Sequence, residues 1–236
     1  MPELTPAEKP PGSSLYLTQM ELGPMQNFVY LVGDREAGEC LVIDPAWEID
    51  SIVNTAEADG LRITGALITH THPDHVGGHL FGTDIPGVAD LLERVPAKVY
   101  VHKAEREFLP GFGSDLVKVE AGTELSVGRL TITFIHTPGH TPGSQCFYVD
   151  GRLISGDTLF IGSCGRTDLP GGDPAEMHRS LTQRLAKLPD ETILLPGHNY
   201  GGEASTIGDE KRANPFMRFG LGDFLRTMGG GRIILP

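Results

Sequence analysis

The sequence predicts an α/β protein built as a four-layer αββα sandwich. Short apolar segments typical of strands occur in two series, one in each half of the 236-residue chain, with helical segments beside them. The 31 glycines and 18 prolines favour tight turns and short strands over long helices. We therefore expect two sheets with helices on their outer faces, and not a helical bundle.

The first series of strands follows a flexible lead-in over residues 1–13, which is rich in proline, glutamate and serine. A turn over 33–38 makes the two strands beside it an antiparallel hairpin. Apolar residues at helical spacing predict an amphipathic helix over 48–59, and Gly60 ends it. The strands of this half are predicted at 15–17, 27–32, 40–45, 63–69 and 98–101.

The second half of the chain repeats this alternation of strands and helices. Residues 79–97 are ambiguous between a loop and a short helix over 88–95, and a helix is expected over 103–109. A longer helix over 173–188 has four apolar residues on one face and Asp173 as its N-cap. The strands of this half are predicted at 130–135, 145–149, 152–155 and 192–195.

We expect residues 14–236 to form a single domain. Its tail over 220–236 contains a short helix over 221–228, which either packs beside the site or reaches a neighbouring subunit. The formal net charge of −12 argues against nucleic acid or an anionic membrane as a partner, because clustered lysine and arginine are lacking. A small-molecule substrate is expected, and a homodimer stays open.

The cysteines and the N-terminal segment bear on the compartment. The chain has three cysteines, Cys40, Cys146 and Cys164, with no C-x-x-C pair, and we interpret them as free thiols. No basic segment followed by an apolar one opens the sequence, and no stretch approaches the roughly 20 apolar residues that span a bilayer. The expected location is the cytoplasm.

The chemistry of the chain is concentrated where the strand ending at Ile68 runs into an H-x-H-x-D-H motif. In an extended segment His70 and His72 share one side, and a turn at Pro73 brings Asp74 and His75 to a second point nearby. Four nitrogen or carboxylate donors within six residues suit two adjacent metal ions better than one. Because the proline and two following glycines break regular structure, these donors are expected in a loop.

Three further strands end near residues of the same chemical type. His140 lies beyond the strand over 130–135, Asp157 follows the strand over 152–155, and His198 follows the strand over 192–195. Strand ends on one edge of a sheet converge, so these loops can build one site with the first motif.

These seven residues resemble the metal ligands of the metallo-β-lactamase superfamily, over roughly residues 15–200. Within it the chain resembles the glyoxalase II (hydroxyacylglutathione hydrolase) branch. True β-lactamases of this fold use a cysteine at a metal position, whereas this chain offers only histidine and aspartate, so antibiotic hydrolysis is disfavoured. The segments that carry the glyoxalase II resemblance are 155–160, 164–166, 197–200, 205–207 and 214–218.

The resemblance implies two divalent metal ions. Imidazole and carboxylate ligands without thiolate suit zinc, with iron or manganese as alternatives. The implied reaction is hydrolysis of a thioester by a metal-bridging hydroxide, which Asp74 and Asp157 orient and whose proton either can relay. The implied ligands are His70, His72 and His140 for one ion, Asp74, His75 and His198 for the other, and Asp157 as the bridge between both.

Residues around the ligands receive roles from the same resemblance. Asp44 is placed behind the ligands, where it would support them by hydrogen bonds. Arg166 and Tyr200 occupy positions at which glyoxalase II contacts glutathione. Glyoxalase II has a helical substrate-binding domain after its last metal histidine, whereas here His198 and Ser205 are only seven residues apart. The chain is therefore expected to have a short tail in place of that domain, which favours a more open, general hydrolase.

One alternative within the superfamily is a persulfide dioxygenase, which has a compact tail and a similar G-R-T-D stretch, here residues 165–168. That enzyme holds one Fe(II) by two histidines and an aspartate, which would be His70, His140 and Asp157. Its relatives usually carry H-A-D-H where this chain has H-P-D-H, so we favour the hydrolase. A more remote alternative is a non-catalytic metal-binding protein, which would be expected to have lost ligands, and none is lost. The histidines not assigned to metal are His79, His102, His136 and His178.

Overall fold

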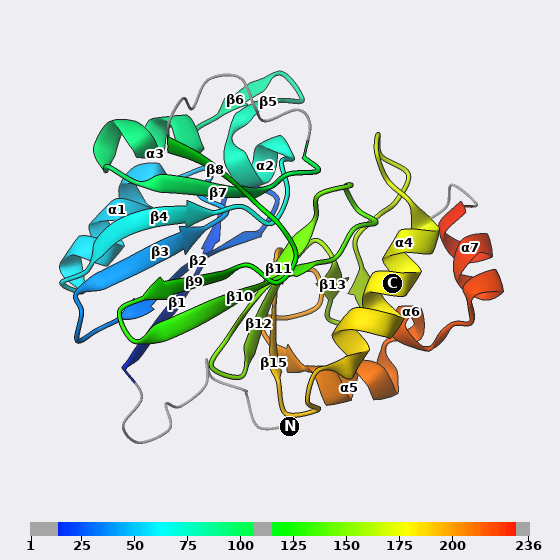
Figure 1. Ribbon diagram of the computed structural model, residues 1–236. Coiled ribbons are helices and arrows are strands. Elements are labelled where there is room, and N and C mark those ends of the chain that lie inside the picture. The colour runs from blue at the N-terminus through cyan, green and yellow to red at the C-terminus, as the bar shows by residue number, and fades with distance from the viewer. Residues whose placement is uncertain (1–13, 106–114, 230–236) are drawn as a thin grey trace.

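The fold is described from a computed structural model, which places residues 14–105 and 115–229 (Figure 1). The expected lead-in at 1–13 and most of the helix expected over 103–109 lie outside these residues. Residues 103–105 form a turn after the preceding strand and not a helix.

The first sheet has six strands in the order β1-β2-β3-β4-β7-β8. The predicted hairpin is confirmed, since β2 and β3 pair antiparallel with Asp34 opposite Glu39. From β3 onwards neighbouring strands run parallel. Their bounds are Leu15–Leu22 (β1), Asn27–Asp34 (β2), Glu39–Ile43 (β3), Arg62–Leu67 (β4), Lys98–His102 (β7) and Leu116–Val119 (β8).

The second sheet also has six strands, in the order β16-β15-β12-β11-β10-β9. Strands β9 to β12 form an antiparallel meander, and β15 joins β12 in parallel. The sequence analysis missed β8, β9 and β16, because these short strands lack a long apolar run. The bounds are Glu124–Val127 (β9), Leu130–His136 (β10), Gln145–Val149 (β11), Arg152–Gly156 (β12), Ile193–Pro196 (β15) and Ser205–Thr206 (β16).

Helices cover the outer faces of both sheets, as Figure 1 shows. Against the first sheet lie α1 (Ile49–Ala58) and α3 (Val88–Arg94). The helix expected over 173–188 is continuous but changes from α-helix to a π-helical turn and then to a 3-10 turn. Its predicted N-cap is confirmed, because Asp173 accepts hydrogen bonds from the N–H groups of Ala175 and Glu176. The helical elements on the second sheet are α4 (Pro174–Arg179), a π-helical turn (Ser180–Arg184), a 3-10 turn (Leu185–Lys187), α5 (Ile207–Ala213), α6 (Pro215–Arg218) and α7 (Leu221–Gly229).

Three apolar clusters fill the three spaces between the four layers, which confirms the predicted sandwich. Alternation along each strand sends successive side chains to opposite faces. In β3, Val42 packs outward beneath the helices, whereas Leu41 and Ile43 pack between the two sheets. The third cluster lies between the second sheet and its helices and includes Met177, Leu181 and Phe224.

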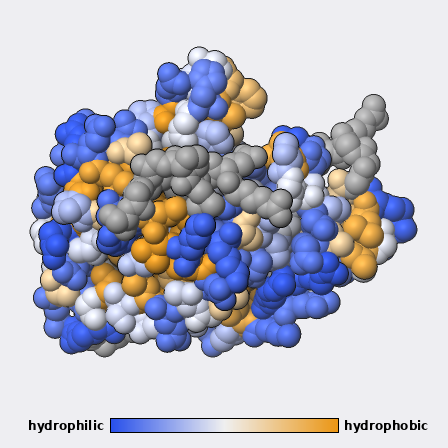
Figure 2. All heavy atoms as spheres, turned by 45° about the horizontal axis from the view of Figure 1, so that its top comes forward, coloured by the Kyte–Doolittle hydropathy of each residue, from blue (hydrophilic) through white to orange (hydrophobic). Residues whose placement is uncertain are grey.

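Two small hairpins lie outside the two main sheets. Strands β5 (Gly78–Leu80) and β6 (Thr83–Ile85) pair where a loop was expected, whereas α3 forms where a short helix was weighed, and β13 (Leu159–Phe160) pairs with β14 (Ser163–Cys164). Among the described helices, none has the length and apolar character needed to cross a bilayer. Figure 2 shows hydrophobic residues at the right flank, the side of α7 in Figure 1, where Leu221 and Leu225 are exposed.

Candidate metal centre

The H-x-H-x-D-H motif follows the end of β4 and is only partly a loop. His70 and His72 lie in extended chain, but residues Pro73–Val76 form a one-turn helix, α2, which carries Asp74 and His75. The expectation that Pro73 breaks regular structure was therefore wrong. Proline suits the first position of a helix, because its fixed φ is helical and its missing N–H needs no partner there.

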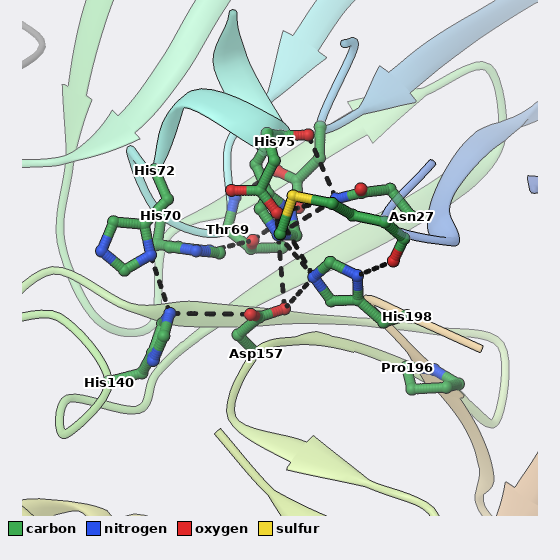
Figure 3. A network of polar contacts seen from close by, with 12 residues as sticks. Asn27, Thr69, His70, His72, His75, His140, Asp157, Pro196 and His198 are labelled. Atoms are coloured by element: carbon green, nitrogen blue, oxygen red, sulfur yellow. Dashed lines mark hydrogen bonds and ion pairs between the residues drawn. The ribbon is translucent and has the colours of Figure 1, made fainter. Parts of the chain in front are cut away.

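The first donor cluster consists of His70, His72 and His140. One nitrogen from each ring lies within 4.8 Å of the others. His140 Nε2 is 2.9 Å from His72 Nδ1. His140 comes from the loop after β10, so this cluster joins the end of the first sheet to the end of the second, and Figure 3 shows the rings turned toward one another.

The second donor cluster consists of Asp74, His75 and His198, which follows β15. The Nε2 atoms of the two histidines are 3.2 Å apart. Asp74 Oδ2 lies 3.4 Å from His75 Nε2 and 3.5 Å from His198 Nε2. All three side chains are buried.

Asp157, directly after β12, stands between the two clusters (Figure 3). Its Oδ1 is 3.4 Å from both His75 Nε2 and His198 Nε2, and its Oδ2 is 3.6 Å from His140 Nε2. One carboxylate oxygen therefore faces each cluster. The structure thus brings together all seven residues that the sequence analysis assigned to metal.

The chemistry of this donor set fits divalent ions. His70 Nε2 and Asp157 Oδ1 are buried and have no hydrogen-bond partner among the described residues. Buried polar atoms normally have a partner, and a bound cation would supply one. Imidazole nitrogens 2.9 and 3.2 Å apart likewise need a proton or a cation between them. Nitrogen and carboxylate ligands suit zinc, iron or manganese.

Burial and neighbouring charge set the protonation of these donors. Burial holds the pKa of His70 well below its usual value, and burial together with His140 lowers the pKa of His72 to about 4. Both imidazoles are then neutral at pH 7, which is the form that binds metal. Burial would raise the pKa of Asp157, but His198 and His75 outweigh it and hold that pKa well below its usual value.

Each of four histidines is oriented by a hydrogen bond from its Nδ1. His140 Nδ1 donates to the carbonyl of Arg166 at 2.7 Å, and His198 Nδ1 donates to the carbonyl of Met25 at 2.9 Å. Carbonyl oxygens only accept, so the proton is on Nδ1 and the Nε2 lone pair faces the centre. The other two rings, His70 and His75, are held by Thr69 and Asp44.

Asp44, which was expected behind the metal ligands, contacts Thr69 and also His75 of the second donor cluster. Its Oδ1 accepts from Thr69 N at 2.7 Å, and its Oδ2 accepts from Thr69 Oγ1 at 2.5 Å and from His75 Nδ1 at 3.0 Å. Since the only hydroxyl proton of Thr69 points to Asp44, its oxygen is free to accept from His70 Nδ1, 3.0 Å away. Asp44 thus orients His75 directly and His70 through the hydroxyl of Thr69.

Sequence reasoning missed three further supporting residues. Asn27 Nδ2 donates to Asp74 Oδ2 at 3.1 Å, and Trp47 Nε1 donates to Asn27 Oδ1 and to the carbonyl of Asp74, both at 3.1 Å. Glu105 is buried beside the loops of the first cluster. An asparagine at the start of a strand and a glutamate in a turn carry no local signal, so only the folded chain reveals these roles.

The two residues expected to contact substrate lie around this centre. The guanidinium of Arg166 is about half exposed and makes two hydrogen bonds to Asp168, at 2.7 and 2.8 Å. The Tyr200 ring stacks on His198, with ring centroids 4.6 Å apart and planes 9° apart. Burial, followed by the charge of Asp157, raises the pKa of Tyr200 to about 12, so its phenol is protonated at neutral pH.

The remaining histidines and the cysteines lie outside both clusters. His102 stacks on His136 with ring centroids 3.8 Å apart, His178 bonds the carbonyl of Phe219, and His79 pairs with Asp84 on the surface. The three cysteines are free and buried, and burial raises the pKa of each thiol.

Comparisons with known proteins point to one family. A family model described as the metallo-beta-lactamase superfamily matches residues 22–198. Human mitochondrial persulfide dioxygenase ETHE1 is 31% identical over 95% of this chain and 85% of its own length. Hydroxyacylglutathione hydrolase of a Synechococcus strain is 37% identical over 74% of this chain and 65% of its own length.

Solved structures also resemble this chain. The crystal structure of ETHE1 from Myxococcus xanthus has a TM-score of 0.80 at 29% identity, covering 93% of each chain. TTHA1623, solved in a di-iron-bound form, has a TM-score of 0.69 at 35% identity, covering 84% of this chain and 99% of its own.

Proposed function

Because the chain belongs to the metallo-beta-lactamase superfamily, we propose that it is a metal-dependent hydrolase that cleaves thioesters of glutathione or a related small thiol. The observation that carries this proposal is the completeness of both donor clusters, with Asp157 between them. A chain that had lost catalysis would have no reason to retain a buried second cluster of Asp74, His75 and His198. The likeness to hydroxyacylglutathione hydrolase supports the choice of substrate class.

The seven donors divide between two ions in this proposal, with zinc as the first choice and iron or manganese as alternatives. One ion would be held by His70, His72 and His140, the other by Asp74, His75 and His198, and both by Asp157. Such ions supply a Lewis acid and a hydroxide nucleophile at neutral pH, since the pKa of bound water falls from about 15.7 toward about 7.

The side chains of the centre would orient the reactants. Asp157 lies between the clusters and Asp74 within the second, and each would accept a hydrogen bond from the attacking water and take its proton. Asn27 fixes the direction of the Asp74 carboxylate through its amide N–H. Arg166 would exchange Asp168 for a substrate carboxylate, and the protonated phenol of Tyr200 would donate to a peptide oxygen. We place the protein in the reducing cytoplasm, which suits its free thiols.

A persulfide dioxygenase is the second candidate. It is favoured by the 31% identity to human persulfide dioxygenase over 95% of the chain. The unpartnered His70 Nε2, together with His140 and Asp157, offers the two histidines and one carboxylate that would suit a single Fe(II). The hydrolase needs a metal ion in the second cluster, whereas the dioxygenase needs none there.

Metal content and a His198→Ala variant separate the two candidates. If the protein is the hydrolase, plasma mass spectrometry should find close to two metals per chain, and the chain should turn over glutathione thioesters. The His198→Ala variant should then lose one of the two metals and also lose turnover. If the protein is the dioxygenase, the chain should hold close to one iron and take up oxygen with glutathione persulfide. The His198→Ala variant should then keep both the iron and the oxygen uptake. Two metals with no thioesterase activity would reject the substrate class but not the two-metal centre.

A further inference from the structure

Glu105 is a buried carboxylate that the proposed reaction does not use. It lies in the turn after β7 and is only 4% exposed. Its Oε2 accepts a hydrogen bond from Thr71 Oγ1 at 2.5 Å, and its Oε1 accepts from Gly143 N at 3.0 Å and from Thr141 Oγ1. Three donors thus compensate for the removal of this carboxylate from water.

The two threonines are direct neighbours of metal-ligand candidates. Thr71 lies between His70 and His72, and Thr141 directly follows His140. These loops leave different sheets, since the first follows β4 and the second follows β10. The two oxygens of Glu105 therefore join the loops that must meet for His140 Nε2 to lie 2.9 Å from His72 Nδ1.

The loop after β10 is shaped around this carboxylate. A Cβ on Gly143 would lie 2.5 Å from Glu105 Cγ and 2.7 Å from its Oε1, so a larger residue would push the side chain away. Within the turn, Ser144 Oγ accepts from Thr141 N at 3.0 Å and lies 2.8 Å from Thr141 Oγ1. The turn thereby aims the Thr141 hydroxyl and the Gly143 amide at one acceptor.

The second cluster is supported by a separate set of groups. Asp74 is held by Asn27, His75 by Asp44 and His198 by the carbonyl of Met25. Glu105 makes none of these contacts, and its hydrogen bonds go to Thr71, Thr141 and Gly143, which lie beside His70, His72 and His140 in the chain.

We infer that Glu105 is a positioning residue that sets the metal affinity of the His70, His72 and His140 cluster, independently of the second cluster. It brings the two loops into register before metal binds. Partners of this kind, one step removed from the metal, typically change affinity by about 10- to 100-fold. The inference rests on the proposed metal centre but not on the reaction, since His70 and His140 belong to the donor sets of both candidate functions.

The test measures zinc binding to the metal-free full-length chain by titration calorimetry in two backgrounds. His198→Ala leaves the first cluster as the intact one, and His140→Ala leaves the second. Glu105→Gln keeps the side-chain size but turns one acceptor oxygen into an N–H donor facing another donor. We expect it to weaken zinc binding about 10- to 100-fold in the His198→Ala background. In the His140→Ala background we expect a change of at most about twofold, because the groups that support the second cluster, Asn27, Asp44 and the carbonyl of Met25, are not partners of Glu105.

Asp34→Asn is the matched control. Asp34 is also a buried carboxylate, 1% exposed, and accepts from the N–H groups of Glu36 and Arg129. It lies at one end of β2, whereas Asn27, which contacts the centre, lies at the other end. The Asp34→Asn variant should therefore leave zinc binding unchanged in both backgrounds. Equal weakening of both clusters by Glu105→Gln, or an equal effect of Asp34→Asn, would overturn the inference.

Two threonine variants keep the test decisive if Glu105→Gln does not fold. Thr71→Val removes one donor at nearly constant volume and should weaken the first cluster selectively, while Thr71→Ser restores the hydroxyl and the affinity. In the metal-free chain, the imidazole nitrogen shifts of His72 and His140 should change with Thr71→Val and not with Asp34→Asn. If the wild-type chain binds only one zinc, the two-metal proposal fails. The inference is then still decided by whether Glu105→Gln weakens the binding of that one zinc.

Discussion

The histidines of the centre are oriented before any metal arrives. Four of them donate Nδ1–H to protein oxygens, which are the carbonyls of Arg166 and Met25, the hydroxyl of Thr69 and the carboxylate of Asp44. Each Nε2 therefore faces the centre, and little reorganisation is needed on binding. The residues that set the tautomers are as much part of the centre as the ligands.

Asp157→Ala tests the shared carboxylate at the scale of one residue. Because its two oxygens face different clusters, its loss should strip metal from both and lower turnover by more than about 100-fold. Metal content by plasma mass spectrometry and thioester kinetics measure this, with Asp34→Asn as the control. A fully metallated and active Asp157→Ala chain would contradict the bridging role.

Arg166→Ala tests the proposed substrate contact. If its guanidinium binds a substrate carboxylate equally in the ground and transition states, KM for glutathione thioesters should rise about 10-fold while kcat changes less. Arg179→Ala is a matched control, because Arg179 is also a partly exposed arginine paired with a carboxylate, on α4. Unchanged kinetics in Arg166→Ala would remove this residue from substrate binding.

At the scale of elements, the loop from Asp157 to Arg166 folds back on itself through the β13–β14 hairpin. Gly165 passes so close to the centre that a Cβ there would lie 1.8 Å from the carbonyl oxygen of Asp157 and 3.3 Å from His140 Cγ. Asn214, at the start of α6, holds the hairpin by donating to the carbonyls of Phe160 and Ser163. The segment around Asn214 that resembles glyoxalase II therefore supports this loop.

Gly165→Ala should displace Asp157 and His140 together. We expect a loss of about 1 to 3 kcal/mol in the free energy of unfolding, typical of overpacking, and fewer metals per chain. Gly220→Ala is the control, because no atom lies within 4 Å of its added Cβ, and its stability should stay within about 1 kcal/mol of wild type. Denaturant unfolding and metal analysis measure both variants. Wild-type metal content in Gly165→Ala would show that the loop relaxes without moving the ligands.

At the scale of the whole molecule, the proposed centre links the two sheets. His70 and His72 follow β4 of the first sheet, whereas His140, Asp157 and His198 follow strands of the second. Metal bound there would join the two halves of the sandwich. The three apolar clusters, in contrast, hold the layers together by burial alone.

Removing metal should lower stability without unfolding the sandwich. A ligand at 100 times its Kd stabilises the native state by about 2.7 kcal/mol, which for a chain of this size shifts Tm by about 5 to 10 °C. Calorimetry with and without a chelator measures the shift, and far-ultraviolet circular dichroism should stay native before the transition. Asp157→Ala should show no chelator effect. Equal Tm values for the metallated and chelated wild type would contradict a metal link between the sheets.

Much of the fold follows from patterns that are local in the sequence. A short apolar run located β3, and helical spacing located α1. Short strands such as β8 carry too few residues for such a pattern, so pairing with β7 defines them. The one-turn helix α2 was missed because proline permits a helix start as readily as a turn.

The sequence by itself determined the candidate donors, because residue type, spacing and position after apolar strands are local properties. Tertiary structure alone decided which atoms face which: the shared position of Asp157, the carbonyl partners of His140 and His198, and the roles of Asn27 and Glu105. Those hydrogen bonds join residues from 26 to 173 positions apart. Such partners meet only when distant segments fold together within each sheet and across the two, and that packing depends on the whole chain rather than on any one segment.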